Sequence, residues 1–447
     1  MRRFSLVWST QLMSAIGSGT AWFAITLWVW AESGSATLFA MLTLLSLAPG
    51  LAMAPIAGAL VDRIGSRVAV LVGDGALAIT TSTVLTLYLT GNLEIWHLYV
   101  IAVFEGVMES LHLVAYMALV PLLVVEERLV RANGMISLAS PGAEILAPAL
   151  GGVLLALTDL SVVLLLDLVT FVFAALVLLV VRTPRPAVAE GERRRSWAVF
   201  RADLLFGFAY IFRSRPLVLL LLLFFVLNFS GAISYALTTP LIMMRSGDDQ
   251  ALLGVVLAAG GAGGVLGALV VSAVGDRFRR MTLVLGGMAV GSVAGPLLLG
   301  LSWTPWLWIA SSLVAGAVLP AVNSAYQAIW QSHVPERQQG RVFGARRLLA
   351  QSSLPLGLLI VGPVVDYVLT PLFTDTGPGI GVTLLGGDKT GATALFLVFA
   401  GLLGLVAVLL AMTSARLREF GEPVATGAVK ASEPPEPTDH EGMSTPR

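Results

Sequence analysis

Long runs without a single charged residue are the feature that most restricts how this chain can fold. The runs are Phe4 to Ala31, Ser33 to Val61, Pro216 to Met244, Gln250 to Gly275 and Thr390 to Ala415. Each exceeds the roughly 20 residues that an α-helix needs to cross the hydrocarbon layer of a bilayer. The runs are apolar on all faces, whereas the strands of a membrane barrel alternate polar and apolar residues. With 57% hydrophobic and 12% charged residues, the chain is predicted to be an all-α, polytopic membrane protein.

Apolar segments and the polar breaks between them predict twelve transmembrane helices. The long uncharged stretch from Met281 to Pro335 is divided at Ser302 to Trp306, where we expect a turn with interfacial tryptophans. The spans lie near residues 5–31, 36–61, 68–90, 96–124, 129–157, 161–181, 216–243, 251–274, 281–301, 304–332, 342–369 and 391–414. If both termini are cytoplasmic, all of the 27 Lys and Arg except Arg245 and Lys389 fall on the cytoplasmic side. The positive-inside rule favours this orientation.

The two halves of the chain repeat one another. An offset of 214 residues relates Asp62-Arg63 to Asp276-Arg277 and Pro121 to Pro335, and nearly the same offset relates Ala147-Pro148 to Gly362-Pro363. Duplicated membrane carriers place their binding site between the two repeats. The sequence therefore predicts two pseudo-symmetric six-helix bundles with a site between them.

The polar segments set the domain boundaries. Residues 182–215 contain prolines and the run Arg193 to Arg195, and Trp197 to Phe212 is expected to form an interfacial amphipathic helix. The end of the chain is rich in Pro, Glu, Thr and Ser, which predicts disorder. The opening Met1 to Arg3 resembles the start of a signal peptide, but the apolar stretch that follows is too long, so we expect a retained span. The predicted domains are the bundles 1–181 and 216–415, a cytoplasmic loop 182–215 and a disordered cytoplasmic tail 416–447.

Several kinds of chemistry have no basis in this sequence. There is no cysteine, which excludes disulfides, thiolate metal sites and a cysteine nucleophile. The glycines from Gly261 to Gly267 have the wrong spacing for a dinucleotide-binding turn and lie in a span, where they favour helix packing. Gly387 to Thr390 lacks the first glycine of a phosphate loop. We therefore expect no enzyme activity, no cofactor, no metal and no nucleic-acid partner.

A short charged motif separates the second and third predicted spans. It consists of Gly58, Asp62, Arg63, Gly65 and Arg67. We expect Asp62 to accept hydrogen bonds from a helix N-terminus of the opposite half, near Gly340-Arg341, and so to hold the cytoplasmic face shut. The arginines would then pair with acids or lipid phosphates. A charged turn that only follows the positive-inside rule is the alternative, and the second copy at Asp276-Arg277 favours the gating role.

With this motif the sequence resembles the major facilitator superfamily, whose loop between spans 2 and 3 has the form G-x-x-x-D-R-x-G-x-R. Further matches to its drug:proton antiporters, including macrolide-efflux and enterobactin-exporter-like proteins, are Asp74, Pro121, Glu126, Ala132 to Gly134, Val334 to Val342 and Pro355 to Gly357. In span 5 the exporter pattern G-P-x-x-G-G begins with Ala147 instead of glycine, but Pro148 still allows a bendable, tightly packed helix. The resemblance implies a secondary transporter and counts Pro148 among the gating residues.

Span 4 carries Glu105, Glu109 and His112, and it lacks the arginine that many proton antiporters of this superfamily have there. Spacings of four and three residues place all three side chains on one helical face. A charged carboxylate in the hydrocarbon layer costs about 2.5 kcal/mol or more, so these groups should face a cavity or a partner. A carboxyl group held away from water also binds its proton more tightly. We expect a proton-coupling site of these residues and Glu144 of span 5. The alternative is a Glu–His pair that only fixes packing, and Asp167 of span 6 is expected to cap structure near the outer surface.

In the resembled fold, spans 1, 4, 7 and 10 line a central cavity. Candidate substrate contacts on these spans are Trp22, Asn228, Tyr235, Asn323, Tyr326 and Gln327. Aromatic residues suit a bulky apolar solute, and polar residues provide hydrogen bonds. The alternative is that the polar side chains only bond neighbouring helices and that the aromatic ones only pack.

These observations predict a secondary transporter of a bacterial inner membrane, with a small molecule, protons and the lipid bilayer as its partners. We expect a monomer that exports a small amphipathic or hydrophobic compound, such as a drug, a siderophore or a secondary metabolite, by proton-coupled alternating access. Export follows from the resemblance alone, so an importer or a lysophospholipid carrier on the same fold is the first alternative. A membrane scaffold or sensor without transport is the second.

Overall fold

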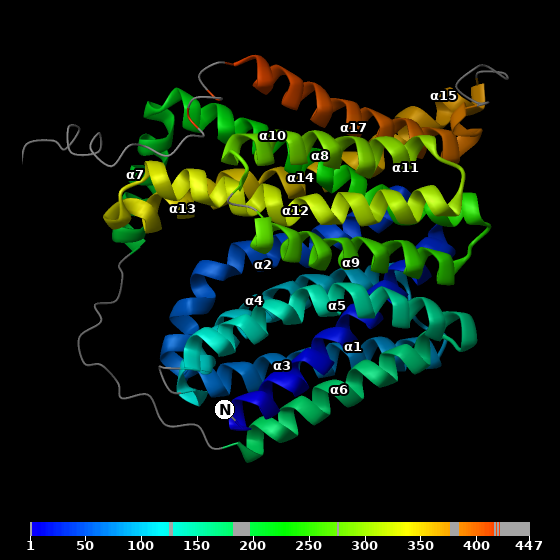
Figure 1. Cartoon of the computed structure of the whole chain (residues 1–447). Helices are drawn as coiled ribbons and strands as arrows, with labels where there is room; N and C mark the ends of the chain where they lie inside the picture. Colours follow the sequence, from blue (N-terminus) through cyan, green and yellow to red (C-terminus); the bar gives the residue numbers. More distant parts are fainter. Residues whose placement is uncertain are drawn as a thin grey trace, which may run out of the picture.

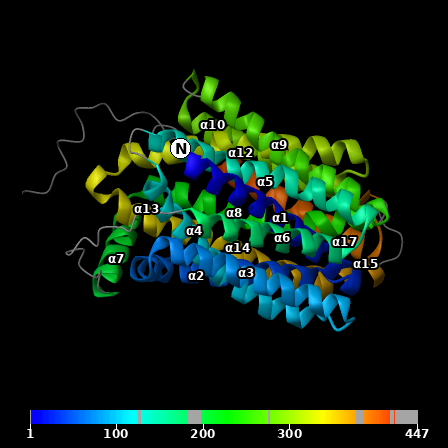
Figure 2. The same cartoon turned by 90° about the horizontal axis from the view of Figure 1, so that it is seen from below.

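A computed structural model of the chain describes residues 2–124, 128–181, 197–274, 277–375, 384–414, 417 and 420. Helices account for nearly all of these residues, and no strand occurs among them (Figure 1). Helix is expected because only helices satisfy every backbone N–H and C=O group within a single apolar segment. The long helices run along one common direction in two perpendicular views (Figures 1 and 2).

The N-terminal half contains six long helices. They are α1 (Arg2–Ser33), α2 (Ala36–Ile64), α3 (Ser66–Leu89), α4 (Ile95–Leu123), α5 (Leu129–Leu157) and α6 (Leu160–Val180). The segment expected to lie at the interface forms α7 (Trp197–Arg213). Of the expected tail, only Leu417 and Phe420 are described: both are helical, Leu417 is buried in the C-terminal half and Phe420 stacks on His333. The loop residues 182–196 lie outside the described residues.

The C-terminal half repeats the pattern with more interruptions. It contains α8 (Arg215–Ser246), α9 (Gln250–Val274), α10 (Arg280–Ser292), the π-helix η3 (Val293–Leu297), α11 (Leu298–Leu301), α12 (Pro305–His333), α13 (Glu336–Gln351), α14 (Ser353–Pro363), the π-helix η4 (Val364–Leu369), α15 (Thr370–Asp375) and α17 (Asp388–Thr413). Pro296 lies in η3 and Pro363 directly precedes η4. Proline removes a helical hydrogen bond, which accounts for the local widening at both places.

Eleven helical stretches among the described residues are long and apolar enough to cross a membrane. The one remaining predicted span, 129–157, corresponds to α5, whose apolar part is the shorter stretch Ile145–Leu157. The prediction of an all-α, polytopic membrane protein is confirmed.

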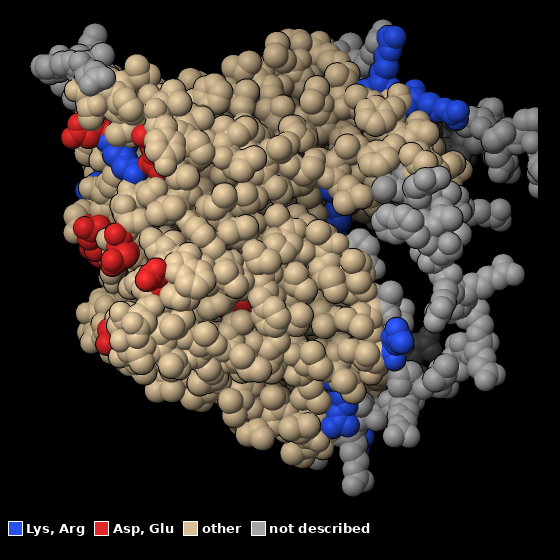
Figure 3. Space-filling model, turned by 180° about the vertical axis from the view of Figure 1, so that it is seen from behind, with Lys and Arg blue, Asp and Glu red and all other residues tan. Residues whose placement is uncertain are grey.

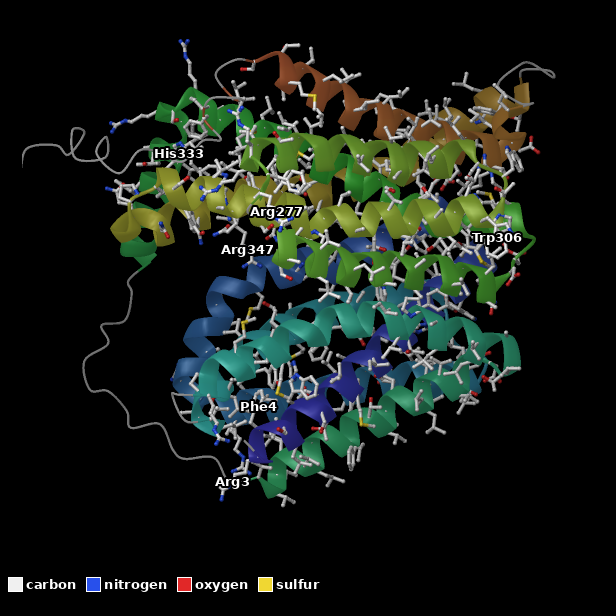
Figure 4. All side chains as sticks on the ribbon, viewed as in Figure 1. Arg3, Phe4, Arg277, Trp306, His333 and Arg347 are labelled. Carbon is white, nitrogen blue, oxygen red and sulfur yellow. The ribbon has the colours of Figure 1, made fainter. Side chains whose placement is uncertain are left out.

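Charged residues divide the molecule into two ends (Figure 3). At the end that we call the basic end, described helices begin or finish at Arg3, Arg63, Arg128, Arg213 and Arg280. At the opposite, acidic end, the helix termini carry Glu32, Glu94, Asp159, Asp249 and Asp388. Figure 4 shows the labelled Arg3 and His333 at the basic end and Trp306 at the acidic end.

The repeat holds in three dimensions, but its offset is not constant. Gly106 of α4 lies against the carbonyl of Ser46, and Gly316 of α12 lies against the carbonyl of Gly260. Ser46 and Gly260 keep the offset of 214, whereas Gly106 and Gly316 are 210 residues apart. The predicted equivalence of Pro121 and Pro335 is therefore wrong. Pro121 lies inside α4, and Pro335 precedes α13.

The buried apolar clusters show where the two halves meet. At the acidic end two clusters contain residues of both halves, one with Ala36 and Ala40 packed with Ile233 and the other with Phe23 packed with Ile242. Toward the basic end each half has a cluster of its own, around Phe4 in the N-terminal half and around Trp330 in the C-terminal half. Among the described residues, the buried apolar clusters that both halves share lie at the acidic end.

Candidate functional site

Two close helix crossings join the halves at the acidic end. In one, Gly152 of α5 lies against Gln250 and Ala251 of α9, and Gly254 lies against the carbonyl of Pro148. In the other, Gly362 of α14 lies against the backbone of Thr37 at the start of α2. Glycines allow such backbone contact because they have no Cβ. Pro148, a predicted gating residue, thus lies at the contact between the halves.

The second crossing carries a polar lock that sequence analysis did not predict. Asp366 Oδ2 accepts hydrogen bonds from Thr37 N at 2.8 Å, Thr37 Oγ1 at 2.6 Å and Ser35 Oγ at 2.8 Å. Asp366 Oδ1 pairs with Lys389 Nζ at 2.6 Å, and the same ammonium donates to the carbonyl of Gly34. Ser35 is the N-cap of α2, so a carboxylate of one half neutralises the positive helix terminus of the other.

A stripe along α4 indicates that the halves separate toward the basic end. Successive turns of one face place Leu98, Ala102 and Gly106 in buried positions. The same stripe continues through Glu109, Leu113 and Met117, all of which are exposed, with Leu113 at 52% and Met117 at 58%. One helical face therefore passes from buried to exposed positions at the level of Glu109.

The equivalent stripe along α12 behaves in the same way. Trp308 is 1% exposed, whereas Leu319, three turns further toward the basic end, is 57% exposed, and Asn323 is also exposed. The two stripes belong to equivalent helices of the two halves. We infer that they line an opening toward the basic end, because the apolar clusters shared by the two halves lie at the acidic end.

The predicted coupling residues of α4 lie at the start of this opening. Glu105 Oε1 accepts a hydrogen bond from Thr80 Oγ1 of α3 at 2.7 Å, and Glu109 is exposed one turn further along. His112 Nε2 lies 2.9 Å from Asp74 Oδ1, and its ring stacks with Tyr116. The three side chains share one face as predicted, and two of them bind α3.

Asp74 and its neighbours extend the cluster. Asp74 is 1% exposed, and its Oδ2 accepts a hydrogen bond from Gln11 Nε2 of α1 at 3.2 Å. The sequence contained the acid but gave no sign that it faces His112, since the two residues lie on different predicted spans. The Asp74 carboxylate therefore joins α3 to α4 through His112 and to α1 through Gln11.

The expectation that Asp167 caps structure near the outer surface is wrong. Asp167 lies within α6 and is 2% exposed. Its carboxylate accepts hydrogen bonds from Thr81 Oγ1 at 2.9 Å and Ser18 Oγ at 3.0 Å. Thr81 follows Thr80, the partner of Glu105, so adjacent threonines of α3 hold two acids of different helices. Asp159, at the start of α6, is the residue that caps the helix.

The predicted gating residues are placed only in part. The side chains of Asp62 and Asp276 lie outside the described residues, as does that of the predicted coupling residue Glu144. Gly65 ends α2 with φ of 88°, a conformation that favours glycine, and Gly58 has open space where a Cβ would point. Arg63 and Arg277 are exposed.

Arg67 departs from its expected pairing with acids or lipid phosphates. Its Nη2 donates to the carbonyls of Leu178 at 2.9 Å and Leu179 at 2.8 Å. These carbonyls belong to the last turn of α6 and have no helical partner of their own. Arg67 therefore caps α6 and holds it to the start of α3.

The candidate substrate contacts fall into two groups. Asn323 and Tyr235 are exposed and Gln327 is half-buried, with Asn323 and Gln327 on the α12 stripe. Trp22, Asn228 and Tyr326 make contacts within one half: Trp22 packs beside α1 residues of the N-terminal core, Asn228 donates to the carbonyl of Ala350 at 3.1 Å, and Tyr326 is 6% exposed against Phe224.

Comparison with known proteins agrees with this architecture. The sequence model of the Major Facilitator Superfamily matches residues 7–358. The chain belongs to this superfamily. The resemblance drawn from the motif between spans 2 and 3 is confirmed, and the chain is a transporter and not an enzyme.

Curated relatives of this transporter include several exporters. It is 23% identical over 379 residues to Macrolide efflux protein A of Streptococcus pyogenes, covering 82% of this chain and 90% of the relative. It is 24% identical to the Enterobactin exporter EntS of Salmonella typhi, covering 74% and 78%. It is also 24% identical to the Multidrug efflux pump Tap of Mycobacterium bovis, covering 81% and 86%.

Solved structures show the same fold. A variant of the nucleoside transporter NupG superposes with a TM-score of 0.72 at 13% identity, covering 91% of this chain and 99% of that one. A bacterial homologue of the iron transporter ferroportin in its inward-facing state superposes with a TM-score of 0.63 at 16% identity, covering 94% and 99%. At these identities the likeness concerns the fold alone.

Proposed function

We propose that this transporter exports a small amphipathic or hydrophobic compound in exchange for protons, with its basic end in the cytoplasm. The observation that carries the proposal is the position of Glu109. It is an exposed carboxylate inside a membrane-spanning helix, located where the α4 stripe enters the opening, with Glu105, His112 and Asp74 next to it.

An acid at this position has two states of very different energy. The charged form is stable only while water or a partner reaches it, because an ionised carboxylate in hydrocarbon costs at least about 2.5 kcal/mol. Protonation removes that cost. In the proposed cycle, a proton from outside neutralises Glu105 or Glu109, the cargo leaves, and the halves rock back. The proton then departs through the opening at the basic end.

Export and orientation have separate support. The named relatives include efflux proteins and an exporter, which favours outward movement of cargo. The arginines at the basic end favour a cytoplasmic location under the positive-inside rule. Both halves of the site lie in one chain, so we infer that a monomer is sufficient.

Transport into inside-out membrane vesicles with an acidic lumen tests the coupling. A labelled macrolide, a catecholate siderophore and a cationic dye serve as probes. We expect at least one probe to accumulate when the gradient is imposed. We further expect Glu105→Gln combined with Glu109→Gln to abolish this accumulation while the protein remains folded in the membrane.

The matched control is Glu32→Gln, which removes an exposed acid at the acidic end and should leave accumulation unchanged. Full gradient-driven accumulation in the double variant would contradict the assignment of the coupling residues. An importer would load intact cells with the probe, whereas an exporter empties them. A scaffold or sensor would give no gradient-dependent movement in either preparation.

A further inference from the structure

The C-terminal half contains a half-buried arginine with an unusual set of neighbours. Arg346 of α13 has its guanidinium 5.0 Å from the ring centre of Tyr326, 5.3 Å from that of Trp330 and 4.8 Å from that of Phe343. Aromatic faces attract a cation at such distances. They supply no acceptor in the plane of the guanidinium, where its five N–H groups point.

The donors of this cluster outnumber its acceptors. Arg346 Nη2 donates to Gln327 Oε1 at 2.6 Å. Arg346 Nη1 is buried without a hydrogen-bond partner, and the buried Tyr326 Oη and Trp330 Nε1 have no partner besides each other. No carboxylate among the described residues forms an ion pair with Arg346. Buried polar groups are almost always satisfied, so this surplus of donors around one cation indicates an absent acceptor.

The cluster lies beside the opening between the halves. Gln327 is on the α12 stripe, one turn beyond the exposed Asn323. Its amide oxygen links Arg346 to that stripe. Arg347, the next residue, is exposed, and Figure 4 shows it at the basic end on the side of the C-terminal half that faces the N-terminal half.

The helical hydrogen bonding is locally weakened close to the same arginine, because Pro355 cannot donate to the carbonyl of Gln351. The helix that contains Arg346 ends at Gln351, and α14 begins at Ser353. The carbonyl of Ala350 is bound by Asn228 Nδ2 at 3.1 Å and Ser353 Oγ at 2.8 Å. Ser352, between these helices, keeps helical dihedrals and its N–H bonds the carbonyl of Leu348, so the helix continues through this point with one local irregularity.

We propose that Arg346, Tyr326 and Trp330 bind the anionic oxygen of the cargo, which makes the substrate class an amphipathic organic anion. The amide oxygen of Gln327 holds the place of that oxygen until the cargo displaces it. The carboxylate or equivalent group of the cargo then accepts hydrogen bonds from the guanidinium of Arg346, the hydroxyl of Tyr326 and the indole N–H of Trp330. The apolar body of the cargo lies against the aromatic rings and the open face of α12. This inference rests on the proposed transport function and specifies its cargo.

Equilibrium binding to the wild-type protein in lipid nanodiscs tests the inference without any gradient. The probes are 2-naphthoate and 2-naphthylmethylammonium, which share an aromatic body and differ in charge. We expect the wild type to bind naphthoate at least about tenfold more tightly, since hydrogen bonds to charged groups are worth more than one factor of ten. Arg346→Gln should abolish this preference, and Arg346→Lys should retain only part of it because lysine lacks the planar fork.

The matched control is Arg347→Gln, which removes the same charge from the neighbouring position and should keep the preference. Gln327→Glu is a second variant, in which Arg346 keeps a hydrogen-bond partner, so the protein should fold. The new carboxylate should pair permanently with Arg346 and block the binding of naphthoate. The inference is overturned if the wild type does not discriminate between the probes, if Arg346→Gln or Gln327→Glu keeps the preference, or if Arg347→Gln loses it equally. Because no proton gradient is present, failure of the proposed coupling leaves these results unaffected.

Discussion

In the N-terminal half, α4 crosses α2 at Gly106, and the exposed Glu109 follows less than one turn later. In the C-terminal half, α12 crosses α9 at Gly316, and the exposed residue at the equivalent place is Leu319. The backbones match, but the chemistry around them differs. The N-terminal interior holds the acids Asp74, Glu105 and Asp167 with hydroxyl, amide and imidazole partners.

The C-terminal interior holds Arg346 with three aromatic rings and one amide. The two halves thus share the backbone geometry of the duplicated scaffold, whereas their buried side chains differ in chemistry and therefore in role. We interpret the N-terminal half as the part that handles protons and the C-terminal half as the part that selects cargo.

The shared crossing gives the largest expected effect. A Cβ at Gly106 would overlap the carbonyl of Ser46, and one at Gly316 would overlap the carbonyl of Gly260. Gly106→Ala and Gly316→Ala should therefore each reduce the yield of folded protein severely, because backbone must move apart to admit the methyl group. Thermal unfolding in detergent, followed by size-exclusion elution, measures the loss.

Each glycine has a matched control in its own half. Gly75 and Gly286 have open space where a Cβ would point, so Gly75→Ala and Gly286→Ala should unfold at the wild-type temperature. Equal tolerance of all four substitutions would show that the crossings do not carry the common scaffold.

A transplant of the acid tests whether the halves differ in chemistry and not only in sequence. Leu319→Glu in a Glu109→Gln background moves the carboxylate to the equivalent place in the other half. We expect cargo-driven proton flux in proteoliposomes to stay at background, because described residues equivalent to Glu105 and His112 are Ala315 and Val322. Restored flux would mean that either half serves for coupling.

The polar lock gives a smaller effect. Asp366→Asn removes the charge that binds Lys389 and the start of α2, and each such hydrogen bond is worth about 1.5–3 kcal/mol. We expect a single cysteine at Ala40, which is 1% exposed in a shared cluster, to react with a thiol reagent about tenfold faster. Asp248→Asn, which changes an exposed acid at the same end, is the control. Equal reaction rates of the Ala40 cysteine in the two variants would show that Asp366 does not hold the halves together.

The sequence was sufficient to predict the spans, because in lipid only a helix satisfies the backbone hydrogen bonds of a single apolar segment. Uncharged runs must be helices, and their boundaries follow from the charges between them. Runs such as Phe4 to Ala31 and Thr390 to Ala415 therefore appear as α1 and α17. The local irregularity at Ser352 was not predicted, although Pro355, four residues after Gln351, removes the hydrogen bond to the Gln351 carbonyl and accounts for it.

The hydrogen-bond partners of the site residues could not be predicted from the sequence. Spacing placed Glu105, Glu109 and His112 on one face, but it did not show that α3 lies against that face. Ser35 and Asp366 are joined although 331 residues separate them. Asp167 was misassigned because its position near the end of a span resembles a cap, whereas its environment depends on how α1, α3 and α6 pack.

The most direct test of the central claim is a distance measurement across the opening at the basic end. The chain has no cysteine, so spin labels can be attached at Arg128→Cys and Phe278→Cys, exposed positions of opposite halves. In nanodiscs, the distance distribution of the otherwise unchanged protein should shift between about pH 5.5 and pH 8, because proton binding in the N-terminal half biases the rocking of the halves. Adding Glu105→Gln and Glu109→Gln should give one distribution at both pH values. A full pH-dependent shift in that variant would contradict the account.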